Sequence, residues 1–121
     1  MCLLWYANRI VRFEFDTDMI DTLYHLFVKN EWMEADCYIK APDAILGYFG
    51  IDATVKRESA RYFCGPKEFE ILKFMVGTVH GGTWNHFVAG DGAGHTTYDP
   101  YGMSRAVREG MLMNKRIFRL L

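Results

Sequence analysis

Residues 84–102 read WNHFVAGDGAGHTTYDPYG and have the pattern of a β-hairpin followed by a turn. Trp84–Ala89 has the aromatic and β-branched residues of a strand, Asp91–Gly94 has the glycines and aspartate of a tight turn, and His95–Asp99 predicts the returning strand. A second turn is expected at Asp99–Gly102, because Asp, Pro and Gly each favour turn conformations. The stretch therefore predicts an antiparallel sheet in the last third of the chain.

The chain before this hairpin carries mostly helical signals. Hydrophobic periodicity and flanking residues predict a half-buried strand at Arg9–Phe15, an amphipathic helix near 18–29, a second helix within Cys37–Phe49, a short strand or extended link at Ile51–Val55, and a third helix from Pro66 to about Gly77. A final strand is expected at Arg116–Leu121. Helices that precede antiparallel strands predict an α+β fold, with the N-terminal helices packed on one face of the sheet.

Length and composition indicate one folded domain over residues 1–121. Half of the residues are hydrophobic (50%) and 16% are aromatic, which excludes a disordered chain. No apolar run is long enough to cross a membrane, and Met1–Asn8 lacks the basic start and the cleavage site of a signal peptide. Three cysteines, an odd number, fit no closed disulfide framework, so we expect free thiols in the cytoplasm.

The charge is unevenly distributed along the chain. The net charge is -1, which argues against generic nucleic-acid binding. Tyr101–Leu121 has five basic residues and one acidic residue, so it carries +4 and the remainder carries -5. This basic tail is either a solvated face of a strand and loop or a patch for an acidic partner. The oligomeric state is left open.

Three residues have the types that nucleophilic thiol catalysis requires. Cys37 lies at or just before the start of an expected helix, and a helix N-terminus stabilises a thiolate. His86 lies in the first strand of the hairpin, and Asp99 ends the second strand, so the two side chains can face each other. Cysteine as nucleophile, histidine as base and aspartate as the group that orients the base form a catalytic triad. The alternative is that His86 is an ordinary hydrogen-bonded strand residue and Asp99 a turn residue.

Two blocks of sequence resemble the papain-like cysteine peptidases. Ala35–Val55 is similar to the nucleophile helix of the bacteriocin-processing (C39-type) peptidases, which have an Asp-Cys pair, a short helix ending in two aromatic residues and a glycine, and then an extended segment. Asn85–Val88 resembles the strand that carries the catalytic histidine in this clan, and Tyr98-Asp99-Pro100 with Gly102 resembles its Asp-Pro ending. The tail from Ser104 to Arg119 is also similar to a family of spirochaete and phage proteins.

The resemblance implies a papain-like α+β fold and a cysteine peptidase. The enzyme would hydrolyse an amide bond in a peptide or protein substrate through Cys37, His86 and Asp99, without a metal or organic cofactor. The backbone N–H of Cys37 and the side chain of Asn30, or a protonated Glu31, would hold the oxyanion. Four further residues are expected to line a substrate cleft, with ordinary core packing as the alternative for the aromatic ones: Trp32, Tyr38, Trp84 and Asn85.

Several departures from the peptidase pattern keep a second function open. Glu31 stands where the clan usually has a glutamine that donates to the oxyanion, and an ionised carboxylate cannot donate. Tyr38 replaces the glycine after the nucleophile. A helix that begins at Cys37 loses a backbone hydrogen bond at Pro42, whereas a helix that begins at Pro42 leaves Cys37 outside its N-terminus and without that activation. The alternative is therefore a catalytically inactive peptidase-like protein that binds a partner, such as a phage-encoded protein acting on a host target.

Other cysteines and histidines offer competing sites. Cys64 precedes Gly65 and Pro66 at an expected helix start, which makes it a second candidate nucleophile, although little chain separates it from His86. Cys2 is expected to be incidental. A zinc site would need histidines from the set His80, His86 and His95 together with a cysteine, but their spacing matches no metal motif, so no metal is expected.

Overall fold

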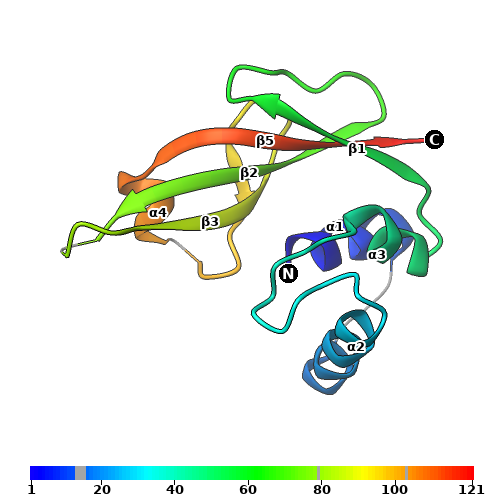
Figure 1. The fold of residues 1–121 in the computed structure, drawn as a ribbon. Helices are drawn as coiled ribbons and strands as arrows, with labels where there is room; N and C mark the ends of the chain where they lie inside the picture. Colours follow the sequence, from blue (N-terminus) through cyan, green and yellow to red (C-terminus); the bar gives the residue numbers. More distant parts are fainter. Residues whose placement is uncertain (13–15, 79, 103) are drawn as a thin grey trace. The chain divides into compact units, whose positions relative to one another are not determined.

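The computed structural model describes residues 1–12, 16–78, 80–102 and 104–121, which form two compact units (Figure 1). The helical unit comprises Leu3–Ala53 with Met1, and the sheet unit comprises Thr54–Leu121 with Cys2. In chain order the elements are α1 (Cys2–Val11), α2 (Thr17–Lys29), α3 (Pro42–Tyr48), β1 (Ala53–Ser59), β2 (Glu68–Gly77), β3 (Thr83–Gly90), β4 (Thr96–Tyr98), α4 (Arg105–Glu109) and β5 (Met111–Leu120). The fold is α+β, as predicted. Among the described residues, no helix has both the length and the apolar character needed to cross a membrane.

Two of the predicted helices in the helical unit are confirmed. The carboxylate of Asp16 accepts a hydrogen bond from the backbone N–H of Met19 (2.7 Å), which caps the start of α2. Helix α3 begins at Pro42, because proline at the first helical position lacks an N–H that would otherwise be unsatisfied. The second helix is therefore shorter than the range Cys37–Phe49 in which it was expected.

Aromatic rings join the helices of this unit. Phe27 of α2 is buried, and its ring centroid lies 5.9 Å from those of Trp32 and Tyr48 and 6.4 Å from that of Phe49. Edge-on and tilted ring contacts of this kind stabilise a core beyond the burial of area alone. The loop that follows α2 is thus tied to α3 through the ring of Phe27.

The N-terminal strand predicted at Arg9–Phe15 is wrong where the structure describes it. Residues 9–11 belong to α1, which ends at Arg12 in a left-handed conformation (φ 54°), and residues 13–15 lie outside the described residues. Leu3, Leu4 and Ala7 are buried and spaced at helical intervals. The apolar helix face that they form favours a helix more strongly than the short alternation after them favours a strand.

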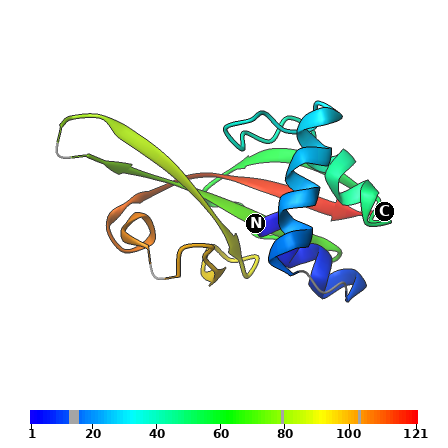
Figure 2. The same cartoon turned by 90° about the horizontal axis from the view of Figure 1, so that it is seen from below.

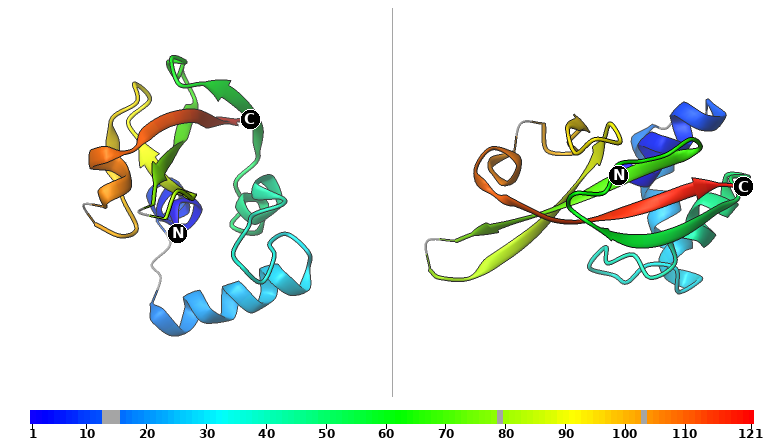
Figure 3. Two further views of the ribbon diagram at one scale, coloured as in Figure 1. Left: turned by 60° about the vertical axis from the view of Figure 1, so that its left-hand side comes forward. Right: turned by 90° about the horizontal axis from the view of Figure 1, so that it is seen from above.

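The sheet has five strands in the order β1-β5-β2-β3-β4, and β5, β2, β3 and β4 pair antiparallel. Figures 2 and 3 show that β2, β3 and β5 are long and twisted, with α4 on the same side of them as β4. The strand expected at Ile51–Val55 appears as β1. The strand expected at Arg116–Leu121 lies in β5, which begins earlier. The prediction that the N-terminal helices pack on this sheet concerns one unit against the other and stays a prediction.

The helix predicted from Pro66 to Gly77 is wrong, because Glu68–Gly77 is the central strand β2. This strand pairs with β3 on one side and β5 on the other, and it has buried apolar residues on both faces, Ile71 on one and Leu72, Phe74 and Val76 on the other. Apolar residues on both faces of a buried strand also match a helical spacing, so periodicity does not separate the two structures.

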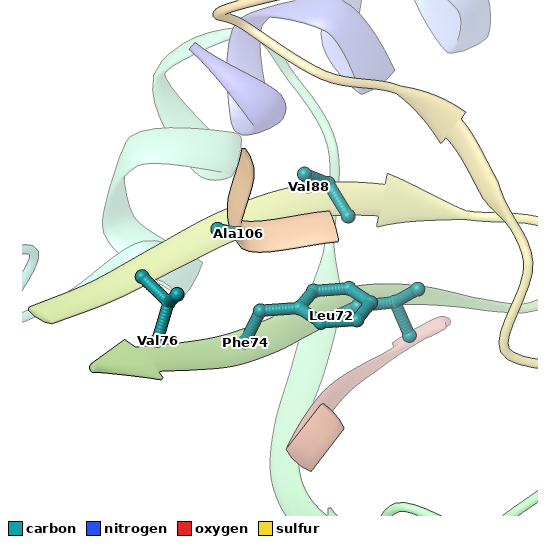
Figure 4. Close-up of a cluster of buried hydrophobic side chains, with 5 residues drawn as sticks. All are labelled: Leu72, Phe74, Val76, Val88 and Ala106. Atoms are coloured by element: carbon teal, nitrogen blue, oxygen red, sulfur yellow. The ribbon is translucent and has the colours of Figure 1, made fainter. Parts of the chain in front are cut away.

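The core of the sheet unit lies between β2, β3 and α4. Leu72, Phe74 and Val76 alternate along β2 and point to one face, where they contact Val88 of β3 and Ala106 of α4 (Figure 4). All five side chains are at least nine-tenths buried. Helix α4, which the sequence pattern did not predict, covers this face and links the turn after β4 to β5.

A buried ion pair joins β2 to β5 on the same sheet. Glu70 and Lys115 are 0% and 1% exposed, and Lys115 Nζ lies 2.9 Å from Glu70 Oε1. Glu70 Oε2 also accepts hydrogen bonds from the backbone N–H groups of Gly92 (3.0 Å) and Gly94 (2.9 Å). Lys115 donates to the carbonyl of Tyr62 (2.7 Å). The pair therefore anchors both the hairpin turn and the segment before β2.

Candidate active site

The predicted hairpin is confirmed, and it brings His86 and Asp99 together. Strand β3 pairs with β4 through Ala89 and Tyr98, so Asp99 follows β4 directly at the flank of β3. The turn between the strands is held by the carboxylate of Asp91, which accepts from the backbone N–H groups of Ala93 (2.8 Å) and His95 (3.1 Å). An aspartate that caps its own turn fixes the register of the hairpin.

The His86 and Asp99 side chains form a short, buried contact. His86 Nε2 lies 2.6 Å from Asp99 Oδ1, and the two side chains are 5% and 6% exposed. A carboxylate that contacts one ring nitrogen sets the tautomer of the imidazole. This pair thus joins two of the predicted site residues directly.

Hydrogen bonds from Ser104, His86 and Tyr101 hold the Asp99 carboxylate in the charged form. Oδ1 accepts from the N–H of Tyr101 (2.9 Å), and Oδ2 accepts from the N–H of Ser104 (3.1 Å). Burial by itself would raise the pKa of Asp99, but hydrogen bonds from Ser104, His86 and Tyr101 outweigh it and lower the pKa below its ordinary value of 3.8. Asp99 is therefore ionised at neutral pH and accepts hydrogen bonds only.

An ionised Asp99 determines which nitrogen of His86 carries the proton. Since the carboxylate only accepts, Nε2 must be the donor, and in the neutral ring Nδ1 is then the basic nitrogen. Within the described part of the chain, no residue hydrogen-bonds to Nδ1. The ring is thus arranged to accept a proton at Nδ1 while Asp99 holds the opposite edge.

Two aromatic rings lie against the imidazole. Tyr101 stacks on His86, with ring centroids 4.9 Å apart and an interplanar angle of 14°. Trp84, which was expected to line a cleft, lies two residues along β3 with its centroid 5.9 Å from that of His86. Asn85 lies between them in sequence, and alternation along the strand places it on the opposite face from His86.

Sequence reasoning missed the contributions of Tyr101 and Ser104. Tyr101 lies in the turn after Asp99, where the Asp-Pro-Tyr-Gly pattern returns the backbone toward the aspartate side chain, and Ser104 follows this turn as the residue before α4. Ser104 also accepts from the N–H of Val107 (3.4 Å) and thereby caps α4. A serine just before a helical run is a recognisable cap signal, but only the helix itself shows that its N–H faces Asp99.

Cys37 lies in the helical unit, so its position relative to His86 and Asp99 stays a prediction. It sits at the tip of a short loop closed by the bridge between Met33 and Ile39, with φ 72°, and its side chain is exposed. Its N–H donates to the carbonyl of Glu34 (2.9 Å). A residue other than glycine at this φ is uncommon and indicates a constrained loop.

The expectation that Cys37 lies at or beside a helix N-terminus is wrong. Helix α3 begins only at Pro42, and the intervening residues form the loop. A helix that started at Cys37 would place Pro42 in its second turn, where the ring would clash with a carbonyl and remove a hydrogen bond. The thiol therefore gains no stabilisation from a helix N-terminus in this conformation.

The groups expected to hold an oxyanion make local hydrogen bonds. Asn30 ends α2, and its side-chain amide donates to the carbonyl of Leu26 (2.8 Å). Glu31 adopts φ 61°, and its N–H donates to the carbonyl of Val28 (3.0 Å). The N–H of Cys37 is hydrogen-bonded locally as well. The oxyanion site therefore stays a prediction, and it requires these local hydrogen bonds to break.

The two aromatic residues near Cys37 differ in exposure. Trp32 is half-buried against Phe27, and its carbonyl accepts from the N–H groups of Lys40 (2.9 Å) and Ala41 (3.1 Å). Tyr38 is 63% exposed, and its N–H donates to the carboxylate of Asp36 (3.0 Å). Trp32 thus serves the core of the helical unit, while Tyr38 presents its ring to solvent.

The other two thiols are weakly acidic. Burial, followed by the nearby Glu70 carboxylate, raises the pKa of Cys64 to about 11, and its Sγ lies 3.9 Å from Glu70 Oε1. Burial raises the pKa of Cys2 to about 11. Cys64 also precedes strand β2 and not the expected helix. A thiol with so high a pKa is almost fully protonated at neutral pH and reacts slowly.

The described residues contain no group of three or more His, Cys, Asp or Glu side chains that could hold a metal ion. His95, one of the three histidines considered for zinc, contacts Asp91 with its Nδ1 atom 3.0 Å from Oδ2 and is 80% exposed. His86 is engaged with Asp99. His86 and His95 therefore contact two separate carboxylates.

Comparison with known proteins gives one match. The family described as "Protein of unknown function, DUF261" matches residues 1–120. No curated protein and no solved structure matches the chain. Because the match extends over nearly the whole sequence, the chain belongs to the DUF261 family.

Proposed function

We propose that this protein is a papain-like cysteine peptidase that hydrolyses an amide bond in a peptide or protein substrate. Cys37 is the nucleophile, His86 the general base and acid, and Asp99 the group that orients the imidazole. The observation that carries the proposal is the buried contact of 2.6 Å between His86 Nε2 and Asp99 Oδ1, which leaves Nδ1 as the proton acceptor.

The thiols support the choice of Cys37 by comparison. Cys2 and Cys64 have pKa values of about 11 and are poor nucleophiles at neutral pH. Cys37 is exposed, so a base and a substrate can both reach its sulfur. The similarity of Ala35–Val55 to the nucleophile segment of C39-type peptidases points to the same residue.

The proposed reaction proceeds in two steps. His86 Nδ1 takes the thiol proton, and the Cys37 thiolate attacks the carbonyl carbon of the amide, so that a carbon–sulfur bond forms and the carbonyl oxygen becomes an oxyanion. The imidazolium then gives its proton to the leaving amine as the carbon–nitrogen bond breaks. In the second step His86 takes a proton from water, hydroxide attacks the thioester, and the acid product leaves as Cys37 regains its proton. Asp99 stabilises the imidazolium in both steps.

The proposed substrate is an extended peptide. Tyr38 and Trp84 carry rings that are 63% and 36% exposed, and such rings bind apolar parts of a peptide. Trp32 and Asn85 were also expected from sequence to contact the substrate, but Trp32 packs against Phe27 and Asn85 lies on the opposite face of β3 from His86, so the proposed contact set does not include them. The oxyanion donors are the N–H of Cys37 and the Asn30 amide, or a protonated Glu31, once the loop releases their local partners.

One observation favours a second candidate function. The N–H of Cys37 is bonded to the Glu34 carbonyl, and the residue holds a left-handed conformation in a closed loop. A loop that stays in this state cannot donate to an oxyanion. In that case the protein is an inactive peptidase-like domain that binds a partner, as the departures at Glu31 and Tyr38 also suggest.

Thiol alkylation tests the proposal without knowledge of the substrate. The wild type, His86→Ala and His95→Ala are treated with iodoacetamide from pH 5 to 10, and the modified cysteine is mapped by mass spectrometry. His95→Ala is the matched control, because His95 is an exposed histidine of the same hairpin that contacts Asp91. We expect Cys37 to react at pH 7 at least about 10-fold faster than an ordinary free thiol.

The histidine variants decide between the two functions. We expect His86→Ala to remove the rate advantage of Cys37 and His95→Ala to keep it. If Cys37 reacts at the same rate in all three proteins, no thiolate–imidazolium pair exists. The peptidase proposal then fails, and the inactive binding protein becomes the better description.

A further inference from the structure

Tyr101 has an unusual combination of exposure and contact. Its side chain is 75% exposed, yet the ring lies nearly parallel to the His86 imidazole, with centroids 4.9 Å apart and an angle of 14°. An exposed tyrosine normally samples several rotamers, so a parallel stack indicates that the ring gains from the contact. One face of the imidazole is thereby covered by a residue that adds little to the core.

The backbone of Tyr101 contacts the other member of the pair. Its N–H donates to Asp99 Oδ1 (2.9 Å), which is the same oxygen that lies 2.6 Å from His86 Nε2. The turn is closed by the N–H of Gly102, which donates to the carbonyl of Asp99 (2.9 Å), and Gly102 has φ 72°, a conformation that glycine adopts without strain. One residue therefore touches both the imidazole and the carboxylate.

A carboxylate alone does not fix the orientation of a histidine ring. The terminal side-chain torsion of histidine is broad, so a ring held only at Nε2 can still tilt about that contact or flip. Trp84 limits this motion from one side, with a centroid distance of 5.9 Å and an angle of 56°. Tyr101 limits it by stacking, and the two rings together leave one favoured plane.

We propose that Tyr101 is a positioning residue. It holds the His86 ring in the plane that keeps Nε2 hydrogen-bonded to Asp99 and leaves Nδ1 free to accept a proton. The inference rests on the proposed function only in the role given to Nδ1, which is to receive the thiol proton of Cys37. The positioning itself involves groups of the sheet unit alone. It can therefore be measured whether or not the protein is a peptidase.

The test reads the ring of His86 directly. Nitrogen-15 NMR of the imidazole at a pH where the ring is neutral gives the fractions of the Nε2–H and Nδ1–H tautomers, with the His86→Ala spectrum for assignment. The wild type should show the Nε2–H form. In Tyr101→Ala the ratio of the Nδ1–H to the Nε2–H form should rise about 2- to 13-fold, the range that a stacked ring pair contributes.

Two further variants separate positioning from general loss of structure. Tyr101→Phe keeps the ring and should restore the wild-type tautomer. Phe63→Ala removes an aromatic side chain of similar exposure (71%) in the same unit and should leave His86 unchanged. If Tyr101→Ala does not fold, Tyr101→Leu replaces it, because leucine keeps apolar bulk without the stacking plane. A wild-type tautomer ratio in the folded Ala or Leu variant overturns the proposal.

Alkylation of Cys37 in the same variants distinguishes this proposal from the proposed function. If both hold, Tyr101→Ala slows Cys37 at pH 7 and Tyr101→Phe does not. A shift in the tautomer ratio with no dependence of Cys37 on His86 supports the positioning role and overturns the peptidase. An unchanged ratio with a His86-dependent Cys37 supports the peptidase and overturns the positioning role.

Discussion

His86 Nε2 and Asp99 Oδ1 are 2.6 Å apart, and both side chains are almost completely buried within the sheet unit. The contact joins a residue in β3 to one that immediately follows β4, so it depends on the register of a single hairpin. Burial alone would raise the pKa of Asp99, but hydrogen bonds from Ser104, His86 and Tyr101 lower it below its ordinary value and keep the carboxylate charged.

The first prediction concerns the pH dependence of stability at Asp99. Its pKa is lowered on folding, so its contribution is fully present above about pH 3.8, its ordinary value, and is lost as the pH falls through the lower pKa of the folded state. We expect Asp99→Asn to reduce the free energy of unfolding at pH 7 by about 1.5–3 kcal/mol, the range for a hydrogen bond to a charged group. Urea unfolding from pH 2 to 7 measures both curves.

The difference between those curves isolates Asp99 from other carboxylates. Asp91 and Glu68 also have lowered pKa values, since backbone N–H groups donate to them, and they titrate in both proteins. The wild-type advantage over Asp99→Asn should therefore shrink below pH 4. A constant difference down to pH 2 would show that the Asp99 carboxylate is not stabilised by folding.

The second prediction concerns the buried pair of Glu70 and Lys115. Removal of one partner leaves an uncompensated charge in the core, so Lys115→Met should lower the free energy of unfolding by about 3–5 kcal/mol. The double variant Glu70→Gln, Lys115→Met should recover part of that loss, because neither charge remains. Urea unfolding of the two single variants and the double variant completes the cycle. Strictly additive effects would contradict a direct interaction.

The third prediction concerns Gly110 at the junction of α4 and β5. A Cβ atom there would lie 2.2 Å from the carbonyl oxygen of Ala106 and 2.8 Å from that of Met75, and both are backbone atoms that cannot rotate away. We expect Gly110→Ala to lower the melting temperature, at a cost of about 1–3 kcal/mol.

Gly47 provides the matched control for this substitution. It lies within α3, and a Cβ atom there would meet nothing within 4 Å. Gly47→Ala should leave stability unchanged or raise it by up to about 1 kcal/mol, because alanine is the better helix former. Equal melting temperatures for the two alanine variants would refute the steric argument.

The fourth prediction concerns the number of reactive thiols in the folded protein. Burial raises the pKa values of Cys2 and Cys64 to about 11, whereas Cys37 is exposed. At pH 8 we expect one thiol to react rapidly in the folded protein and all three in denaturant. Timed alkylation with mass spectrometry counts them. Rapid modification of Cys64 under native conditions would show that its environment beside Glu70 opens readily.

The hairpin and its flanking turns could be predicted from sequence because their signals are local. Asp91 bonds to N–H groups within its own turn, and Asp99 accepts from Tyr101 two residues later. Hydrogen bonds of this kind involve only neighbouring residues, so the local sequence predicts the turns. Once the hairpin is known, the proximity of His86 and Asp99 follows from strand pairing.

The segment before the hairpin shows where local signals fail. Phe69, Leu72, Met75 and Val76 have the spacing of an amphipathic helix, yet they lie in strand β2. Partners on both sides decide the structure, since β2 pairs with β3 through Leu72 and Val88 and with β5 through Leu72 and Lys115. Backbone pairing with two distant strands outweighs a weak helical preference.

The sequence by itself determined the α+β class, the helix α2, the two turns, and the hairpin that brings His86 to Asp99, because these depend on residues a few positions apart. Only the tertiary structure decided that Glu68–Gly77 is a strand, that Glu70 pairs with Lys115, and that Tyr101 stacks on His86. It also decided which thiols are buried beside carboxylates and which is exposed. Pairing and burial depend on contacts between groups far apart in the chain, and a local sequence pattern does not indicate which of these contacts form.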